Sequence, residues 1–301
     1  MAGHIPLVFL TVPEIKRVLD ELGQVPRKRH GQNFIHALPS IERILDLCGF
    51  SLGDQVLEIG PGLGAFTLNI ARRAKHVHAI ELNPSFAGYL QKRVAELGIT
   101  NVDIQVADAL DLDFPGGCTV LFSAMPYSIS APLTFKMLDY LQHAPAVAPA
   151  RAFITCQKEF GEKLVAKPGT MDYGRIAANA SLISRAEILM RVSRNNFYPV
   201  PDVDSVLVRL LRHELVPPDE VAEACIALTR GLFPYKNKVL RKAMTLLVEH
   251  QEGHAVPPGL LDALPCKDKR VHALTVEDLQ AIAGWHAKVV KQGKLARGLG
   301  R

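Results

Sequence analysis

Residues 55–65 read Gln-Val-Leu-Glu-Ile-Gly-Pro-Gly-Leu-Gly-Ala, and this stretch decides the fold class. The short apolar run 55–59 predicts a buried strand. The glycines that follow predict a tight turn, because a residue without a Cβ lets the backbone turn sharply and lie against a ligand. The run 65–73 predicts a helix. A strand, a glycine turn and a helix in this order are typical of open α/β sheets that bind nucleotide cofactors.

The same alternation continues along the chain and predicts a Rossmann-like α/β domain built on a parallel sheet with crossover helices. Residues 76–81 are expected to form the second strand. Asn83 can cap the helix that follows, with Pro84 at its first position, where a missing N–H costs little. Further strands are expected at 102–106, 118–122, 152–156, 186–192 and 206–211.

A boundary is expected near Pro217-Pro218, after which residues 219–232, 238–250 and 276–290 read as helices. We therefore expect an α/β domain over residues 1–212, with an N-terminal extension at 1–30, and a small helical domain over 213–301. Residues 229–301 carry 13 Lys and Arg against 6 Asp and Glu, whereas the whole chain has a net charge of +5. A basic helical module suits a phosphate backbone, although the charge asymmetry alone favours a solvated helix face.

Composition argues for a reduced cytoplasmic protein. The five cysteines contain no C-x-x-C pair, which argues against both a disulfide framework and a zinc site. The histidines are scattered and form no H-E-x-x-H pattern, so no metal site is expected. The apolar run 5–10 is too short to span a membrane, and it lacks the flanks of a signal peptide. No coiled-coil pattern appears, so we expect a monomer without a membrane partner.

A glycine turn and two acidic residues, each following a predicted strand, outline a cofactor site. The turn reads G-x-G-x-x-A from Gly60 to Ala65, a pattern shared by dinucleotide-binding and S-adenosylmethionine (SAM)-binding proteins. Glu81 ends the second strand, where a carboxylate can accept both ribose hydroxyls of either cofactor. Asp108 ends the third strand, where it can accept a hydrogen bond from an adenine amino group. The glycine turn alone also permits an NAD-dependent oxidoreductase.

A further motif, Ala124-Met125-Pro126-Tyr127, follows the fourth strand at the carboxyl edge of the sheet, where ligands bind in open α/β folds. A proline followed by an aromatic residue is unusual there for a dehydrogenase. In isolation the pair is equally compatible with a rigid turn and a packing tyrosine. Together with the preceding features it favours SAM over NAD.

Five segments in a shared order carry a resemblance to a known family, and they cover nearly the whole chain from about residue 26. The sequence resembles the small-subunit ribosomal RNA adenine dimethyltransferases, the KsgA group and its archaeal relatives. The segments are Arg27 to Phe34, Val56 to Gly62, Tyr173 to Arg175, Phe197 to Ser205 and Lys236 to Lys242. The resemblance implies a class I methyltransferase sheet with a small C-terminal helical domain.

The resemblance implies SAM as the cofactor and assigns residues to it. Glu81 would hold its ribose and Asp108 its adenine, and Gly60 would approach it by the backbone. The other residues implied to border it are Asn33, Ile35, Gly62 and Ala124.

The implied reaction is dimethylation of adjacent adenine amino groups in a loop of small-subunit rRNA, with a role in ribosome biogenesis. A loop suits this chemistry, because unpaired bases turn into a pocket at a low unstacking cost. The resemblance places RNA-binding side chains in the basic segment, at Lys236, Lys238, Arg241 and Lys242. Another alternative is a large-subunit rRNA methyltransferase of the antibiotic-resistance type, but this basic segment resembles the small-subunit group better.

The sequence departs from the family at the catalytic motif, where the family has Asn-Leu-Pro-Tyr and this chain has Ala124 in place of the asparagine. The resemblance implies that the target adenine is activated by two acceptors for its amine hydrogens, the asparagine side-chain oxygen and a backbone carbonyl of the motif. The tyrosine would stack on the adenine base. The resemblance therefore leaves Pro126 and Tyr127 as catalytic groups. Ser123, one residue earlier, points to the opposite side of an extended segment and is not expected to substitute.

Three interpretations of Ala124 remain open. The protein is a slow methyltransferase, a non-catalytic RNA-binding assembly factor, or an active enzyme in which this residue has been engineered.

Overall fold

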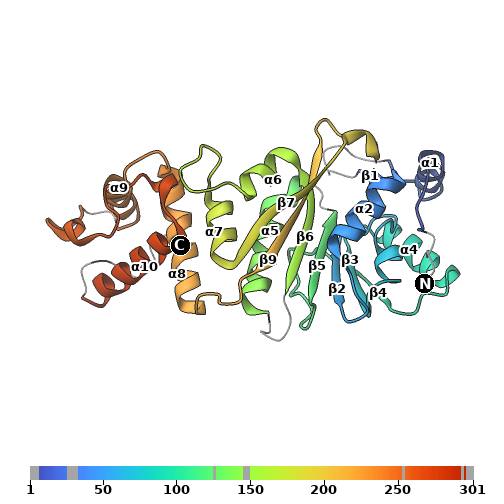
Figure 1. The fold of residues 1–301 in the computed structure, drawn as a ribbon, viewed down its shortest axis with the longest axis horizontal. Helices are drawn as coiled ribbons and strands as arrows, with labels where there is room; N and C mark the ends of the chain where they lie inside the picture. The colour runs from blue at the N-terminus through green and yellow to red at the C-terminus, as the bar shows by residue number, and fades with distance from the viewer. Residues whose placement is uncertain are drawn as a thin grey trace. The chain divides into compact units, whose positions relative to one another are not determined.

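The computed structural model describes residues 7–25, 33–124, 127–144, 150–252, 255–292 and 295 of the 301-residue chain (Figure 1). The contacts divide the chain into two compact units. The first comprises Met1–Gly161 and Glu187–Arg212, and the second comprises Glu162–Ala186 and His213–Arg301. Among the described residues, no helix combines the length and the apolar character needed to cross a membrane.

The division differs from the expected one in the segment 162–186, which belongs to the second unit although it precedes residue 212. Helix α7 (Arg175–Ile183) packs against α8 (Asp219–Leu232) and α10 (Val276–Lys291). Two hydrogen bonds strengthen this packing: the Tyr173 hydroxyl donates to the Leu274 carbonyl, and the Thr229 hydroxyl donates to Asn179. Helix α9 (Leu240–Glu252) also contacts α8.

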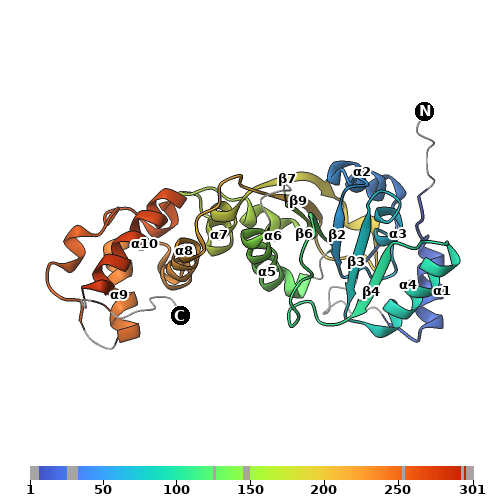
Figure 2. The ribbon, with the colours of Figure 1, turned by 90° about the horizontal axis from the view of Figure 1, so that it is seen from below.

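A seven-stranded sheet runs through the first unit in the order β4-β3-β2-β5-β6-β9-β7 (Figure 2). Strands β2 to β6 pair in parallel, whereas β9 is inserted between β6 and β7 and runs antiparallel to β6. The expectation of a parallel sheet is therefore corrected at this edge. The strands are β2 (Gln55–Ile59), β3 (His76–Glu81), β4 (Val102–Val106), β5 (Val120–Ala124), β6 (Arg151–Gln157), β7 (Ser184–Val192) and β9 (Ser205–Arg212).

Two predicted elements change length for local reasons. The helix expected at 65–73 is regular only in α3 (Thr67–Ile70), because beyond it the Arg73 N–H bonds only three residues back, to Ile70. The strand expected at 118–122 begins at Val120, because the N–H of Cys118 donates to the Tyr140 hydroxyl instead of joining the sheet ladder.

Helices cover one face of the sheet at its β3–β4 edge. Val102 and Ile104 of β4 pack against Leu90 and Val94 of α4 (Pro84–Glu96). Asn83 caps α4 through its side-chain oxygen, as its sequence predicts, with Pro84 at the first position. Helices α2 (Leu38–Cys48) and α5 (Ser130–His143) also belong to this unit, and α6 (Lys158–Leu164) spans the division between the two units.

The N-terminal segment forms an ordered helix, α1 (Val12–Glu21), which begins at a capping box between Thr11 and Glu14. Its buried residues pack against Leu63 of the glycine turn and Phe86 of α4. Accordingly, α1 and α4 lie side by side in both views (Figures 1 and 2). After α1, a short β1 (Phe34–Ile35) pairs antiparallel with β8 (Phe197–Tyr198).

Candidate active site

A cavity of about 370 Å³ lies in the first unit, at the carboxyl ends of β2, β3 and β5. Its volume falls within the range of small-molecule sites. Every residue that the family resemblance assigns to the cofactor lines this one cavity: Asn33, Ile35, Gly60, Gly62, Glu81, Asp108 and Ala124.

The glycine turn has a conformation that side chains disfavour. Gly60 and Gly62 have φ angles of 74° and 56°, in the left-handed region that glycine adopts at no steric cost. A Cβ on Gly62 would lie 3.4 Å from the ring of Phe34, so any larger residue would crowd the cavity wall. The Gly62 N–H donates to Oε2 of Glu81 at 2.9 Å, which ties the turn to the end of β3.

Glu81 is held at the base of the cavity with 7% of its surface exposed. Its second oxygen, Oε1, accepts the N–H of Asn83 at 2.8 Å. Burial raises the pKa of this carboxyl, although hydrogen bonds from the backbone of Asn83, Gly62 and Leu82 oppose the rise. The next residue, Leu82, lines the cavity with 66% of its surface exposed. A carboxylate beside an exposed apolar side chain suits a ligand that has hydroxyls next to a flat ring.

Asp108 lies two residues beyond the end of β4 at Val106, not at the strand end itself. Its Oδ1 accepts the N–H of Leu110 at 2.8 Å, and the half-buried side chain lines the cavity. This hydrogen bond orients the carboxylate and leaves Oδ2 as an acceptor toward a ligand.

Ala124 is the last residue of β5, opposite Thr155 of β6, and lines the cavity. Ser123 is fully buried, and its hydroxyl donates to the carbonyl of Ile59 at 2.9 Å. Ser123 therefore does not reach the cavity to replace the missing asparagine. Met125 and Pro126 lie outside the described residues, and Tyr127 is described only by its backbone, at the start of a 3₁₀ turn.

The N-terminal arm, residues 7–25, is a part of the site that the sequence did not reveal. Val8, Phe9, Leu10 and Ile15 line the cavity. Asn69 of α3, which is fully buried, holds the arm by two hydrogen bonds: it accepts the Val8 N–H at 2.9 Å and donates to the Val8 carbonyl at 2.6 Å. The amphipathic pattern of α1 was the available signal, but it does not say what the helix packs against.

We expect Asn69→Ala to weaken ligand binding in the cavity by up to about 30-fold, because two hydrogen bonds that position Val8 are worth about 1 kcal/mol each. Isothermal titration with SAM measures the change. Asn101→Ala is the matched control, since Asn101 donates to the carbonyls of Ala71 and Ala74 in the same unit and does not line the cavity. Equal affinities for the two variants would show that the arm does not shape the site.

Glu58 is a buried carboxyl in the strand that leads into the glycine turn, and only 1% of its surface is exposed. Burial raises its pKa to about 8, and repulsion from Glu81 adds to the rise. A folded-state pKa above the unfolded value of about 4.5 makes folding progressively less favourable as the pH rises between these values. Because its pKa in the folded protein is about 8, Glu58 is neutral in the folded state over most of this pH range.

We expect the free energy of unfolding to fall between about pH 4.5 and pH 8, and Glu58→Gln to make this fall shallower. The difference in slope should approach ~1.4 kcal/mol per pH unit, the value for one proton. Urea unfolding at pH 5, 6.5 and 8 measures both slopes. Parallel curves for the two proteins would mean that Glu58 ionises normally in the folded state.

In the second unit, the basic segment Lys236 to Lys242 lies beside another basic segment, residues 267–272. Residues 236–241 exchange backbone hydrogen bonds with residues 267–272, and Val239 forms a β-bridge with Arg270. This pairing brings Lys267 and Arg270 to the segment that contains Lys238 and Lys242, which are both exposed. The sequence alone did not reveal this convergence, because it depends on pairing between distant residues.

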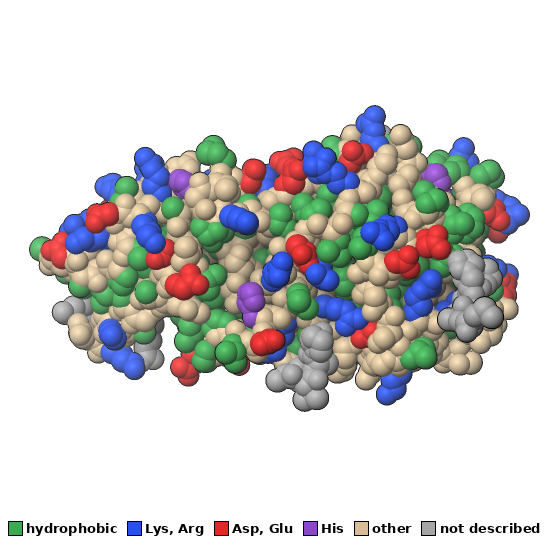
Figure 3. Space-filling view, viewed as in Figure 1, with side chains coloured by type: hydrophobic (Ala, Val, Ile, Leu, Met, Phe, Trp, Pro, Cys, Tyr) green, Lys and Arg blue, Asp and Glu red, His purple; other side chains and the backbone are tan. Residues whose placement is uncertain are grey.

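Acidic groups neutralise part of this basic surface. Arg241 forms an ion pair with Asp262, and Lys269 forms one with Asp278 at 2.7 Å. Lys236 donates to the carbonyl of Met171. Figure 3 shows basic and acidic side chains interspersed over the second unit on the face in view. Lys238 and Lys242 are thus better placed than Arg241 to meet a phosphate.

The sheet order, the glycine turn and the cavity at the carboxyl ends of the strands define a class I methyltransferase fold. Comparison with known proteins then gives the family. The sequence model described as "Ribosomal RNA adenine dimethylase" matches residues 23–279, and the chain belongs to this family. Membership decides against the oxidoreductase alternative.

Relatives and solved structures agree with this assignment. "Probable ribosomal RNA small subunit methyltransferase A" of Methanothermobacter thermautotrophicus is 35% identical over 90% of this chain and 94% of its own. "Probable dimethyladenosine transferase" of Dictyostelium discoideum is 39% identical over 71% of this chain and 66% of its own. The crystal structure of a dimethyladenosine transferase from Plasmodium falciparum is 26% identical, with a TM-score of 0.70 over 87% of this chain and 98% of its own. The crystal structure of the 23S rRNA methyltransferase ErmE is 25% identical, with a TM-score of 0.60 over 84% of this chain and 98% of its own.

Proposed function

We propose that this protein transfers methyl groups from SAM to the amino groups of adjacent adenines in a loop of small-subunit rRNA. The observation that carries the proposal is the convergence of all seven expected cofactor residues on one cavity. The small-subunit names of the relatives, at 32–36% identity, favour this substrate over 23S rRNA.

The cavity fits SAM in four respects. Glu81 presents carboxylate oxygens for the two ribose hydroxyls, and the exposed Leu82 offers an apolar surface for the adenine ring. Asp108 has an acceptor for the adenine amino group. The left-handed backbone at Gly60 and Gly62 lets the chain approach the methionine part closely, where a Cβ would intrude. When bound, SAM supplies an electrophilic methyl group on a sulfonium.

The target adenine would enter beside Ala124, at the end of β5. An adenine amine is a poor nucleophile, because its lone pair is delocalised into the ring. The carbonyl of Pro126 would accept one amine hydrogen, and the ring of Tyr127 would stack on the base and hold its nitrogen in line with the methyl group. Ala124 offers no acceptor for the second hydrogen, so we infer that this chain carries only part of the family's activating groups.

We further propose that the second unit, including residues 213–301, binds rRNA phosphates through Lys238 and Lys242, with Lys236 and Arg241 in supporting positions. The convergence of Lys267 and Arg270 on the same segment supports this role, because phosphate binding depends on the local density of positive charge. We expect the protein to act as a monomer.

Replacing both Lys238 and Lys242 by Gln should make RNA binding less dependent on salt. Each lost phosphate contact lowers the slope of log K against log salt by roughly 0.7–0.9, so the double variant should lose about 1.4–1.8. Filter binding to small ribosomal subunits between 50 and 200 mM salt measures the slope. The control is Lys92→Gln, an exposed lysine on α4. An unchanged slope in the double variant would remove this surface from the RNA interface.

The proposed reaction is tested by incubating the protein with labelled SAM and small subunits that lack the modification, followed by mass spectrometry of rRNA fragments. We expect dimethylated adenine in a single loop fragment. SAM binding without any methyl incorporation would refute the enzymatic proposal.

That outcome would favour the second candidate, a non-catalytic RNA-binding assembly factor, which the alanine at position 124 motivates. Incorporation into 23S rRNA alone would instead point to a large-subunit methyltransferase, to which the likeness to ErmE directs attention.

A further inference from the structure

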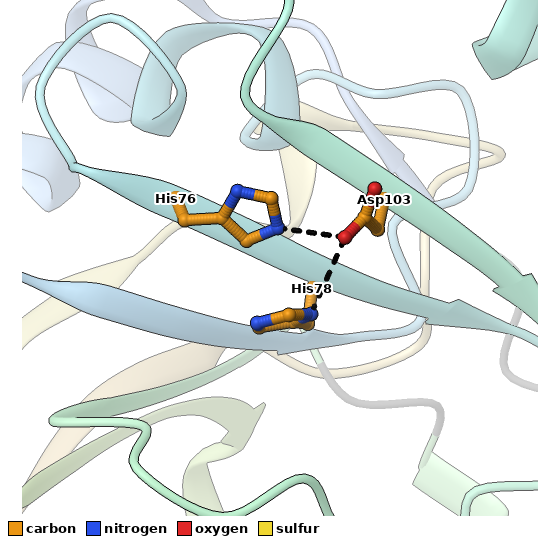
Figure 4. A group of neighbouring side chains, drawn as sticks. All are labelled: His76, His78 and Asp103. Carbon is orange, nitrogen blue, oxygen red and sulfur yellow. Dashed lines mark hydrogen bonds and ion pairs between the residues drawn. The ribbon is translucent and has the colours of Figure 1, made fainter.

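Two histidines and an aspartate gather at one edge of the sheet in the first unit, and none of them lines the cavity (Figure 4). His76 and His78 lie two residues apart on β3, so they project from the same face of the strand. The parallel pairing of β3 with β4 places Asp103 directly opposite His78. Val77 is buried in the core on the opposite face, so the three polar side chains project away from it.

The three side chains point toward a common centre, as Figure 4 shows. Nε2 of His76 lies 2.9 Å from Oδ2 of Asp103, and Nδ1 of His78 lies 3.8 Å from the same oxygen. One nitrogen from each ring and one carboxylate oxygen all lie within 4.8 Å of one another. A tetrahedral zinc ion with bonds of about 2.0–2.1 Å holds its ligands roughly 3.4 Å apart. Small side-chain rotations therefore bring these atoms to ligating positions.

The ligand atoms of these three side chains, imidazole nitrogen and carboxylate oxygen, suit a metal ion such as Zn²⁺, which accepts both kinds. The ring centroids of His76 and His78 lie 4.4 Å apart, so both imidazoles can reach one ion. The side chain of Asp103 is 73% exposed, so an ion and a water ligand have access from solvent.

We propose that His76, His78 and Asp103 bind one Zn²⁺ ion, with water completing a tetrahedron. Two imidazoles and one carboxylate form an established zinc ligand set, and a water in the fourth position is usual for a three-residue site. The ion ties β4, the edge strand, to β3. It takes no part in methyl transfer, so this proposal is independent of the proposed function.

The sequence analysis expected no metal site, because it looked for ligands at short spacings. Asp103 lies 25 residues after His78, and only the register of two strands brings them together. The pair His76-Val77-His78 in a predicted strand was the one signal available.

Isothermal titration tests the proposal on the full chain, expressed without a histidine tag and stripped with chelator. We expect one Zn²⁺ bound per chain and no binding of Mg²⁺, which prefers oxygen ligands. Asp103→Asn and His78→Gln should each weaken Zn²⁺ binding at least tenfold, since even the loss of a residue that supports a ligand costs about 10–100-fold. His143→Gln is the matched control, because His143 lies 3.8 Å from Asp139 on α5 in an i,i+4 pair.

Two results would overturn the proposal: no Zn²⁺ binding by the native chain, or unchanged binding by the double variant His76→Gln/His78→Gln. Circular dichroism checks that each variant folds. Should His78→Gln not fold, Asp103→Asn decides, because its side chain is mostly exposed. Titration with Co²⁺ gives a second readout: strong visible absorption is expected for a tetrahedral site, and its absence contradicts this geometry.

Discussion

Ala124→Asn is expected to raise the rate of methyl transfer by about 10² to 10³, the usual contribution of one acceptor or donor that acts on developing charge. The new side chain starts from the end of β5 and faces the cavity, where its oxygen can accept an amine hydrogen of the target adenine. The neighbouring Ser123 does not provide this acceptor, because its hydroxyl is bonded to the carbonyl of Ile59. Single-turnover methylation of small subunits measures the effect.

Ala124→Leu is the control, since leucine is similar in size to asparagine and has no acceptor. We expect it to give no increase over the native chain, and SAM affinity to be similar in all three proteins. Equal rates for Ala124→Asn and the native chain would show that this protein activates the amine by another route. The same result would remove the main reason to consider a non-catalytic assembly factor.

Glu81→Ala is expected to weaken SAM binding by at least about 100-fold. Two ribose hydroxyls would lose a charged acceptor, and hydrogen bonds to charged groups contribute about 1.5–3 kcal/mol each. In the native chain the Gly62 N–H donates to Oε2 of Glu81. The substitution removes this bond, so the glycine turn loses its link to β3. Isothermal titration with SAM at pH 7.5 gives the dissociation constants.

Asp108→Asn provides the comparison, because it changes a single acceptor toward the cofactor and should cost no more than about tenfold. Thermal unfolding of each variant separates lost binding from lost folding. A folded Glu81→Ala protein that binds SAM within twofold of the native affinity would place the cofactor elsewhere.

Elements with strong local signals were predicted accurately. The apolar runs that form β2 and β3 have the expected bounds, because a glycine turn and a terminal acid mark their ends. The start of α4 was also predicted, because Asn83 and Pro84 act within one turn of the helix. The same local chemistry predicted the glycine turn, Glu81 and Asp108 as cavity residues, whereas Asn33, Ile35 and Ala124 came from the family resemblance.

Features that depend on distant partners could not be read from the sequence. The insertion of β9 between β6 and β7 follows from tertiary packing, and an apolar run does not encode its neighbours. Asn69 holds Val8 across 61 residues, so the arm's place at the cavity was hidden. The segment 162–186 joins the second unit through contacts such as Tyr173 with Leu274, which are 101 residues apart.

The anchored N-terminal arm has a practical consequence for protein production. The family match begins at residue 23, whereas Val8, Phe9, Leu10 and Ile15 precede it and line the cavity. A gene trimmed to the family boundary would yield a protein with one wall of its pocket open to water and with the apolar side chains beneath α1 uncovered. Expression clones should therefore retain the first 22 residues and carry any purification tag at the other end.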